Sequence, residues 1–535
     1  MATSFIFVAR YYSRAFDPNI ILLEYNMLCK NILKIDIICD ILNEQIRSKG
    51  ILEKKDGGYM VFSSDVFLFA FFPLLFVLYY NPFCKGRGFR NVVLVLASLG
   101  FYAWGEPVFV LVMLAAILVS WWCGQRISYL KQEEQRKQKK LVLSLGIGFF
   151  LCLLFGFKYL SFCMRELGIL LHAEWRTLSI PLPAGVSFFT FQCMSYLFDI
   201  YYGKAEAQKN ILKVGLYVSL FPQLIAGPIV RYEQIAGEIE QRRESRKDIV
   251  EGMERFIFGL GKKVLLANYM AVIADNLFYG NRNLAMLTAW LGAIAYALQI
   301  YFDFSGYSDM AIGLGRVFGF HFKENFYYPY VSGSITEFWR RWHISLSGWF
   351  RDYVYIPLGG NRVKQMLWIR NLFVVWFLTG IWHGANWTFL VWGLFYFVCL
   401  LTEKLTGLPE KLEAGALGIR AIRHLYTMAA VVIAWVMFRA DTVTKGIQYI
   451  GWMFGIDSAG VVDAMFLSYL QRGGILFFIA VLFAMPVYPL LKKKCQRIKG
   501  KMAEVAGSLL IIGVFLLSLL VVVSSSYNPF IYFNF

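Results

Sequence analysis

Residues Asn371 to Thr402, with the sequence NLFVVWFLTGIWHGANWTFLVWGLFYFVCLLT, form a run of 32 residues that is apolar enough to lie within a membrane. His383 is the only Asp, Glu, Lys, Arg or His residue in this run. An ionisable side chain inside hydrocarbon is costly unless it faces a bundle interior or a wet cavity, so His383 is a candidate functional residue. A helix starting near Arg370 would place it about 20 Å into an apolar layer about 30 Å thick.

The whole chain has the composition of a protein with many membrane spans. Its 535 residues are 58% hydrophobic and 16% charged, against about 25% charged residues in soluble globular proteins. Apolar runs of about 20 residues recur along most of the length, which predicts an all-α polytopic membrane protein without a large soluble domain. The net charge of +18 is concentrated between these runs, so we expect it to reflect membrane topology rather than nucleic-acid binding.

The apolar runs predict a series of spanning or re-entrant segments. Several are shorter than about 17 residues and cannot cross a membrane alone, so we expect about 11 to 13 crossings plus re-entrant or interfacial helices. The segments lie near residues 65–80, 90–104, 107–123, 141–163, 183–202, 211–229, 256–279, 285–302, 303–320, 371–383, 385–402, 424–439, 474–491 and 507–524. The polar stretch 242–254 (RRESRKDIVEGME) has helical periodicity, which predicts a further helix at the interface.

Residues 1–59 differ from the rest of the chain. They mix charged residues with apolar patches that neither span a membrane nor form a signal peptide. Met60 directly precedes the first strong apolar run, so we predict a membrane domain over residues 60–535. The preceding segment is then a mis-set start or a poorly ordered cytoplasmic extension.

Three basic segments predict the orientation in the membrane. They are Arg126–Lys140, Arg231–Lys263 and Lys492–Lys501, with six, eight and six Lys or Arg residues. The positive-inside rule predicts that all three are cytoplasmic. The last helix would then exit on the opposite side, where the uncharged tail 524–535 follows.

A second candidate region is Tyr327–Arg362, which combines aromatic residues with Arg340, Arg341 and Arg351. One interpretation is an interfacial re-entrant helix whose arginine side chains extend toward the headgroups. The other is the floor of a donor-binding cavity, because guanidinium groups bind phosphates such as those of coenzyme A or phosphopantetheine.

His343 and His383 each follow a tryptophan, in segments 40 residues apart. Two imidazoles without nearby carboxylates or thiolates make a poor zinc site, so we expect no metal. His383 could be a structural histidine bonded to a neighbouring carbonyl, or a general base that takes the proton of an attacking hydroxyl and returns it to a leaving thiol. Trp382 and Asn386 flank it and are expected to line the substrate site.

Two polar stretches interrupt apolar surroundings and are predicted to be structural. Asp303 and Asp309 need cationic partners inside the bundle, and Arg316, Arg340 or Arg341 could supply them. The prolines of the stretch 220–231 are expected to break a helix near the cytoplasmic face. No G-x-S-x-G motif occurs, so the sequence offers no serine nucleophile of that kind.

Seven stretches together resemble the membrane-bound O-acyltransferase (MBOAT) family, in particular its bacterial AlgI-like branch, which takes part in alginate O-acetylation. They are FSSDVFLFAFFPLLFVLYY, SFFTFQCMSYLFDIYYG, FPQLIAGPIVR, QIYFDFSGYSDMAIG, FWRRWHISLSGWFRDYVYIPLGGNR, TGIWHGANW and YNPFIYF. The resemblance implies a ring of tilted transmembrane helices around a central funnel or tunnel. It also implies that His343 and His383 are the two signature histidines, with His383 catalytic.

The resemblance further implies a function and its participants. We expect a multi-pass protein of the bacterial cytoplasmic membrane that transfers an acyl group, most simply acetyl, from a cytoplasmic thioester donor for O-acetylation of an exported or cell-wall polysaccharide. The donor would be acetyl coenzyme A or an acyl carrier protein's phosphopantetheine, used as substrate, with no bound cofactor. Expected partners are membrane lipid, an extracytoplasmic accessory acyltransferase or the polysaccharide acceptor, and an acyl carrier protein. The alternatives are a non-catalytic transporter, DltB-like transfer of D-alanine to teichoic acid, and acylation of a lipid or small protein.

Overall fold

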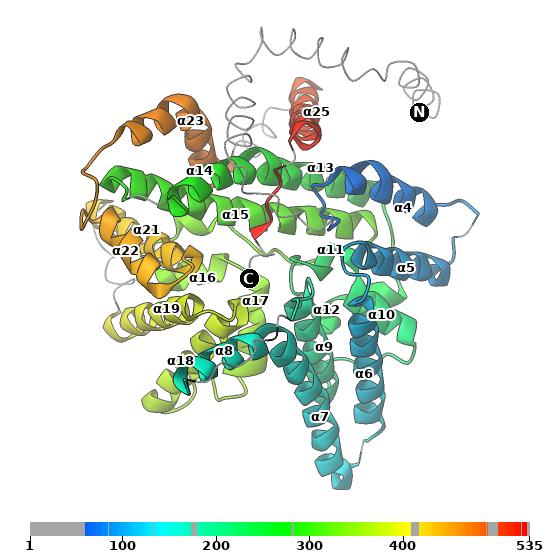
Figure 1. Cartoon of the computed structure of the whole chain (residues 1–535). Coiled ribbons are helices and arrows are strands. Elements are labelled where there is room, and N and C mark those ends of the chain that lie inside the picture. Colours follow the sequence, from blue (N-terminus) through cyan, green and yellow to red (C-terminus); the bar gives the residue numbers. More distant parts are fainter. Residues whose placement is uncertain are drawn as a thin grey trace. The chain divides into compact units, whose positions relative to one another are not determined.

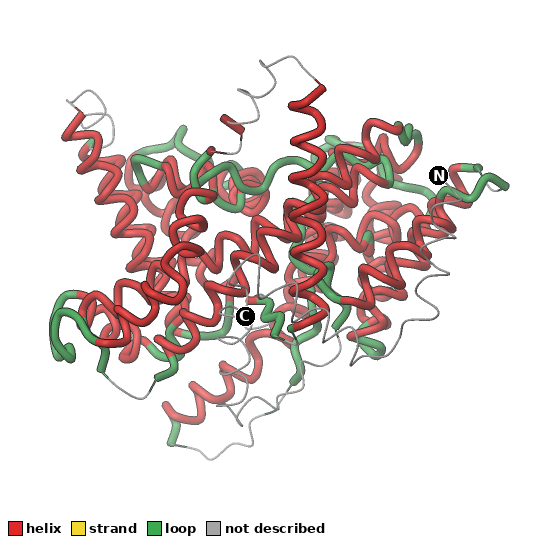
Figure 2. The backbone as a smooth tube through the Cα atoms, turned by 90° about the horizontal axis from the view of Figure 1, so that it is seen from above, coloured by secondary structure: helices red, strands yellow, loops and turns green. Residues whose placement is uncertain are grey.

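The chain folds into helices, as its apolar runs predict. Figure 1 shows the computed structural model, which describes residues 59–535 except 84, 131, 173–177, 179, 281–282, 408–416, 488, 491–500, 526 and 532–535. The described residues form helices and loops and contain no strand, as the tube of Figure 2 makes visible. The predictions for residues 1–58 and 492–500 lie outside the described residues.

The helices follow one another with short connections. The first part of the described chain contains α4 (Phe72–Tyr79), α5 (Arg87–Gly105), α6 (Val110–Tyr129), α7 (Arg136–Leu154), α8 (Leu160–Leu170), α9 (Val186–Tyr201), α10 (Ile211–Ser219), α11 (Phe221–Leu224), α12 (Tyr232–Glu240), α13 (Arg246–Gly261) and α14 (Asn268–Phe278). The second part contains α15 (Met286–Val317), α16 (Ile335–Arg341), α17 (Ile344–Phe350), α18 (Gln365–His383), α19 (Trp387–Thr406), α21 (Leu417–Arg439), α22 (Val443–Met453), α23 (Ala464–Phe483) and α25 (Lys501–Ser524).

Four wider π-helical turns interrupt or extend these helices. They are η1 (Phe67–Phe71), η3 (Phe155–Tyr159), η4 (Lys262–Ala267) and η6 (Arg351–Tyr355). η3 joins α7 to α8 and η4 joins α13 to α14, so each pair continues as one long helical segment.

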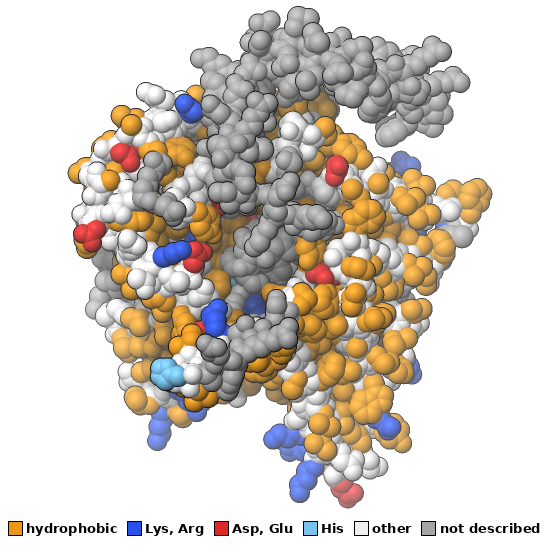
Figure 3. All heavy atoms as spheres, in the orientation of Figure 1, with side chains coloured by type: hydrophobic (Ala, Val, Ile, Leu, Met, Phe, Trp, Pro, Cys, Tyr) orange, Lys and Arg blue, Asp and Glu red, His pale blue; other side chains and the backbone are white. Residues whose placement is uncertain are grey.

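Eight helical segments of the described chain are long and apolar enough to cross a membrane, which confirms an all-α polytopic architecture. They are Val110–Tyr129, Arg136–Leu170, Arg246–Phe278, Met286–Val317, Trp387–Thr406, Gly418–Arg439, Ala464–Phe483 and Val505–Ser524. The other expected segments form helices that are shorter or less apolar, among them α5, α9, α10 and α18. In Figure 3, hydrophobic side chains cover much of the face over α4, α5 and α6, as contact with lipid requires.

The prediction of two separate segments at 285–302 and 303–320 is wrong. The chain forms one 32-residue helix, α15, through this region. The polar residues did not end the helix because α13, which lies against it (Figure 1), and η4 supply cations that pair with Asp303 and Asp309. A Cβ atom on Gly306 would lie 2.8 Å from the Gly259 carbonyl oxygen, so glycines allow the close approach of α13 and α15.

The expected partners of the two buried aspartates are also wrong. Asp303 pairs with Lys263 at 2.7 Å, and both side chains are almost fully buried. Asp309 pairs with Arg255 at 2.7 Å and with Lys262 at 2.6 Å. All three cations come from α13 and η4, because those elements run beside α15. Of the expected partners, Arg316 pairs with Glu251 and Arg341 with Glu337 instead.

The C-terminal tail binds the buried pair of Lys263 and Asp303. Lys263 also donates to the Pro529 carbonyl, and the Ile531 backbone N–H donates to Asp303 at 2.9 Å. The ring of Phe530 stacks on Tyr307 with centroids 5.0 Å apart. Figure 1 shows the tail passing from α25 toward α15. The tail is therefore fastened to the core through the charges of α15 and η4.

The basic segment Arg231–Lys263 is not a loop, and the stretch 242–254 is not a separate interfacial helix. The segment contains α12 and α13, and α13 begins after Ser245, whose side chain accepts from the Asp248 backbone N–H at 2.9 Å. Arg242 is buried and donates to Asn91 at 2.7 Å and to the Phe318 carbonyl at 3.0 Å. Part of the positive charge in this segment therefore holds helices together.

We predict that Asp303→Leu destabilises the protein strongly. The substitution leaves the Lys263 ammonium buried without its carboxylate, and breaking a buried pair from one side costs about 3–5 kcal/mol. The melting temperature in detergent, followed by tryptophan fluorescence, should fall clearly. The double variant Asp303→Leu, Lys263→Met should recover much of the loss, and equal melting temperatures for wild type and Asp303→Leu would contradict this role.

We also predict that Gly306→Ala separates α13 from α15 and lowers the melting temperature. Its added methyl group would meet the Gly259 carbonyl, which is backbone and cannot turn away. Gly513→Ala in α25 is the matched control, because a Cβ atom there has no neighbour within 4 Å. If both variants melt together with the wild type, the close packing inferred here is wrong.

Candidate functional site

The 32-residue apolar run breaks directly after His383. α18 ends at His383, and α19 begins four residues later. Asn386 caps the N-terminus of α19, where its side-chain oxygen accepts from the Thr388 backbone N–H at 3.2 Å. The two expected segments 371–383 and 385–402 are thus confirmed, and His383 lies at the turn between them.

α18 and α19 pack against each other as a helical hairpin (Figure 1). A Cβ atom on Gly380 would lie 2.7 Å from the Phe389 carbonyl oxygen, and one on Gly393 would lie 2.6 Å from the Trp376 carbonyl oxygen. Larger residues would force the two helices apart. The close packing therefore holds His383 at the end of a rigid hairpin.

Aromatic rings surround the imidazole of His383. Its ring centroid lies 5.0 Å from Trp382, 5.0 Å from Trp392 and 5.1 Å from Phe438. Trp392 and Phe438 are buried, whereas His383 keeps part of its surface accessible. The ionisable groups that act on this imidazole are His343 and Lys158, and no carboxylate of the described residues is among them. The site thus presents a reachable imidazole in an apolar, aromatic setting.

His343 lies near the same tryptophan. Its ring centroid is 6.2 Å from Trp382, so Trp382 contacts both His343 and His383. His343 precedes α17 with φ 44°, in the left-handed region that few residues other than glycine adopt. Such strain costs about 1–3 kcal/mol and is concentrated at functional sites. The backbone is therefore held in an unfavourable conformation that brings His343 to this site.

Several buried polar atoms around the histidines have no partner. Within the described part of the chain, the indole N–H groups of Trp339, Trp382 and Trp392 find no acceptor, and Nδ1 of His343 receives no hydrogen bond from another residue. Buried polar groups are nearly always hydrogen-bonded, so each exception needs an explanation. Indole groups only donate. A bound molecule with carbonyl or hydroxyl oxygens, or water, would satisfy them.

Of the three predicted donor-binding arginines, Arg340 and Arg341 end α16, whereas Arg351 opens η6. Arg340 is exposed at the end of α16. Arg341 pairs with Glu337 at 2.8 Å. Arg351 opens η6 and donates to Asp352 at 2.6 Å. No carboxylate of the described residues is shared by the three guanidinium groups. The role of these arginines in donor binding stays a prediction.

Asp352 shows how this region is held together. Burial alone would raise the pKa of its carboxyl group, but Arg351 and Arg231 donate to it and hold the pKa below its usual value. Arg231 is mostly buried between Asp352 and the Tyr353 ring, which lies 5.5 Å away. The ion pairs therefore anchor η6 to the start of α12.

Both polar groups of Asn386 are engaged within the protein. Besides capping α19, its amide nitrogen donates to the Asp441 carbonyl at 2.9 Å. Asn386 therefore fixes the turn after His383 to the start of α22. Contact with a substrate stays a prediction for Asn386 and for Trp382.

Sequence reasoning overlooked Lys158 and Tyr159, which approach His383 from η3. Lys158 donates to the Trp382 carbonyl at 2.6 Å, and the Tyr159 hydroxyl donates to the Ile381 carbonyl at 2.9 Å. The signal was available, because Lys158 is the only charged residue in the expected span 141–163. The approach of Trp392 and Phe438 had no comparable signal, since tryptophan and phenylalanine are common in every apolar run of this chain.

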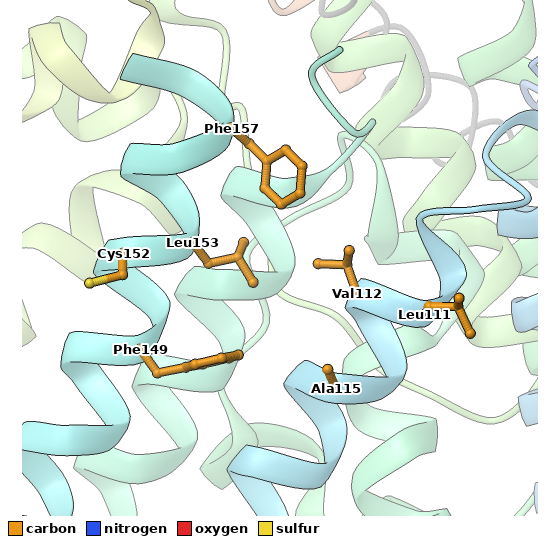
Figure 4. Close-up of a pocket in the computed structure, with 7 residues that line it drawn as sticks. All are labelled: Leu111, Val112, Ala115, Phe149, Cys152, Leu153 and Phe157. Atoms are coloured by element: carbon orange, nitrogen blue, oxygen red, sulfur yellow. The ribbon is translucent and has the colours of Figure 1, made fainter. Parts of the chain in front are cut away.

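A separate groove lies between α6 and α7 and has a volume of about 520 Å³. Figure 4 shows its lining residues, of which Val112, Ala115, Phe149, Leu153 and Phe157 face the space between the two helices, while Leu111 and Cys152 lie at its edges. The lining is apolar except for one thiol, so the groove provides no group for acid-base chemistry. Within the described residues no three His, Cys, Asp or Glu side chains gather where they could hold a metal ion.

Comparisons of the sequence with known proteins identify a family and several relatives. The sequence model of the membrane-bound O-acyltransferase family matches residues 207–408, a range that includes both histidines. A probable alginate O-acetylase AlgI of Pseudomonas putida is 37% identical over 89% of this chain and 100% of its own length. A peptidoglycan O-acetyltransferase of Helicobacter pylori is 33% identical over 75% of this chain and 81% of its own.

A more distant relative is the teichoic acid D-alanyltransferase of Bacillus subtilis, 27% identical over 44% of this chain and 64% of its own length. Every relative named here is a transferase of acyl groups. The O-acetylating relatives also match most of the chain at more than 30% identity. The range matched by the family model contains His343 and His383, and both lie against Trp382. This chain therefore belongs to the membrane-bound O-acyltransferase family and is a multi-pass membrane acyltransferase.

Proposed function

We propose that this acyltransferase moves an acetyl group from a cytoplasmic thioester donor to a hydroxyl of an exported or cell-wall polysaccharide, with His383 as general base. The observation that carries the proposal is the placement of His383 at the break between α18 and α19, reachable and without a carboxylate partner among the described residues. A neutral imidazole in such a place is suited to accept a proton.

The reaction balances with the groups at this site. His383 takes the proton of the acceptor hydroxyl while the hydroxyl oxygen attacks the thioester carbon. The C–S bond then breaks, an ester forms, and the imidazolium returns the proton to the leaving thiolate. His343 would orient the donor or assist this proton transfer, and the unpaired indole N–H groups of Trp382 and Trp392 would donate to oxygens of the bound molecule.

The relatives support acetyl transfer over D-alanyl transfer. The alginate and peptidoglycan O-acetylating relatives match 75–89% of this chain, against 44% for the teichoic acid D-alanyltransferase. The names of the former support a polysaccharide as acceptor. A purely transporting role has no support among these names, because each describes a group transfer.

The donor and the partners complete the proposal. The donor, acetyl coenzyme A or an acyl carrier's phosphopantetheine, would dock near Arg340, Arg341 and Arg351, whose guanidinium groups bind phosphate. The protein would lie in the cytoplasmic membrane of a bacterium. The acceptor, or an extracytoplasmic accessory acyltransferase that passes the acetyl group on, would approach from the opposite side of the membrane.

We predict that His383→Ala reduces acetyl transfer by a factor of about 10² to 10⁴, because general-base catalysis contributes that much. The measurement is thiol release from acetyl coenzyme A by the purified protein with its partners. His321→Ala is the control, since that histidine is exposed and bonded to Glu238 on the surface. Undiminished thiol release by a folded His383→Ala protein would reject the proposed role of His383 and favour a non-catalytic function.

We further predict that Arg340→Gln raises the KM for acetyl coenzyme A severalfold while kcat stays near the wild-type value. The exposed guanidinium would bind the donor's phosphates without taking part in bond making. Lys247→Gln, which removes an exposed positive charge from α13, is the control. An unchanged KM in the Arg340 variant, or an equal rise in the control, would remove Arg340 from the donor site.

A further inference from the structure

The Lys158 side chain lies beside the hairpin of α18 and α19. Lys158 is part of η3, within the membrane-crossing segment Arg136–Leu170. Its Nζ atom lies 2.6 Å from the Trp382 carbonyl oxygen, 3.4 Å from the Ser187 hydroxyl and 5.7 Å from the centroid of the Trp382 ring. No carboxylate of the described residues pairs with it. A charge kept in a membrane-crossing helix without a counter-ion indicates a function, since an uncharged residue would cost less.

Lys158 donates a hydrogen bond to a carbonyl group at the C-terminal end of α18. The last carbonyl groups of a helix have no partner within that helix. Near the end of α18, the Ile381 carbonyl accepts from the Gly384 backbone N–H and from the Tyr159 hydroxyl, and the Trp382 carbonyl accepts from Lys158. A positive charge at a helix C-terminus is also favoured by the helix dipole. Two neighbouring side chains of η3 thus close the end of α18 directly before His383.

The π-helical turn explains how both side chains reach the same helix end. Consecutive residues of an α-helix point about 100° apart, yet Lys158 and Tyr159 bond to consecutive carbonyls of α18. The turn Phe155–Tyr159 locally widens the helix at this point. Single π-helical turns within α-helices occur frequently at functional sites.

We propose that Lys158 is a positioning residue for the acetyl-transfer reaction. Its ammonium binds the Trp382 carbonyl and the Trp382 ring, and thereby fixes the end of α18 so that the His383 imidazole meets the reacting groups. This inference rests on the proposed function, because it assigns Lys158 to the same catalytic step. In this role Lys158 exchanges no proton with the substrate, and no covalent bond to Lys158 is made or broken.

The proposal predicts a loss in kcat and not in donor binding. In Lys158→Met the Trp382 carbonyl loses its donor and the imidazole can shift, and a displacement of about 1 Å at a reacting group costs about 10²-fold in rate. The KM for acetyl coenzyme A should change little, because Lys158 contacts α18 and α9 and not the arginines of Tyr327–Arg362. Lys158→Arg keeps a donating cation and should recover most of kcat.

The test compares four variants by kcat and KM for thiol release from acetyl coenzyme A, with melting temperature as a check on folding. The variants are Lys158→Met, Lys158→Arg, Ser187→Ala and His383→Ala. Ser187→Ala is the matched control. It removes the longer contact of Lys158, the one to the Ser187 hydroxyl, and leaves the shorter hydrogen bond to the Trp382 carbonyl of α18. The proposal expects a low kcat in Lys158→Met, recovery in Lys158→Arg and near wild-type activity in Ser187→Ala.

The outcomes separate this inference from the proposed function. Full activity of Lys158→Met together with an inactive His383→Ala would overturn the positioning role and leave the function standing. Activity in His383→Ala would overturn both. The inference would also be overturned if Lys158→Met and Lys158→Arg lost kcat equally and both had a lowered melting temperature. Such a result would indicate that Lys158 has a structural role alone. If Lys158→Met does not fold, the Arg variant decides, since a folded Lys158→Arg protein without activity contradicts the proposal.

Discussion

Charges that lie inside the helical body need partners from the protein itself, and this requirement organises the fold. Lys263 and Asp303 bind each other and then the backbone of the C-terminal tail, so one buried pair joins η4, α15 and the last residues of the chain. A second group joins Asp309 to Arg255 and Lys262 along the same helix contact. Lipid cannot hydrogen-bond to such groups, so the helices that supply the partners have to pack together.

The same requirement shapes the candidate site. The break after His383 exposes carbonyl groups at the end of α18, and Lys158 and Tyr159 supply the missing donors from a different helix. Glycines at the contact of α18 and α19 keep this hairpin tight. The buried polar atoms of the described residues that lack a partner include the indole N–H of Trp382 and Nδ1 of His343. The backbone is thus bonded at the helix end, while these two side chains keep polar atoms free for a bound molecule.

Sequence reasoning succeeded where a local pattern carries the information and failed where partners come from distant segments. The apolar runs predicted the helices, and the expected segments 371–383 and 385–402 predicted the break after His383. Polar residues in 301–309 suggested a boundary that does not exist, because glycines of α13 and cations of η4 accommodate them in one helix. The expected arginine partners of Asp303 and Asp309 were wrong for the same reason.

The sequence by itself determined that this protein is an all-helical membrane acyltransferase and predicted functions for His343 and His383, because hydrophobic length and motif spacing are local properties. Only the tertiary structure decided that Trp382 contacts both histidines, that η3 closes the end of α18, and that the tail binds the Lys263 and Asp303 pair. These contacts join residues far apart in the chain. Their geometry depends on helix packing, which no single stretch of sequence contains.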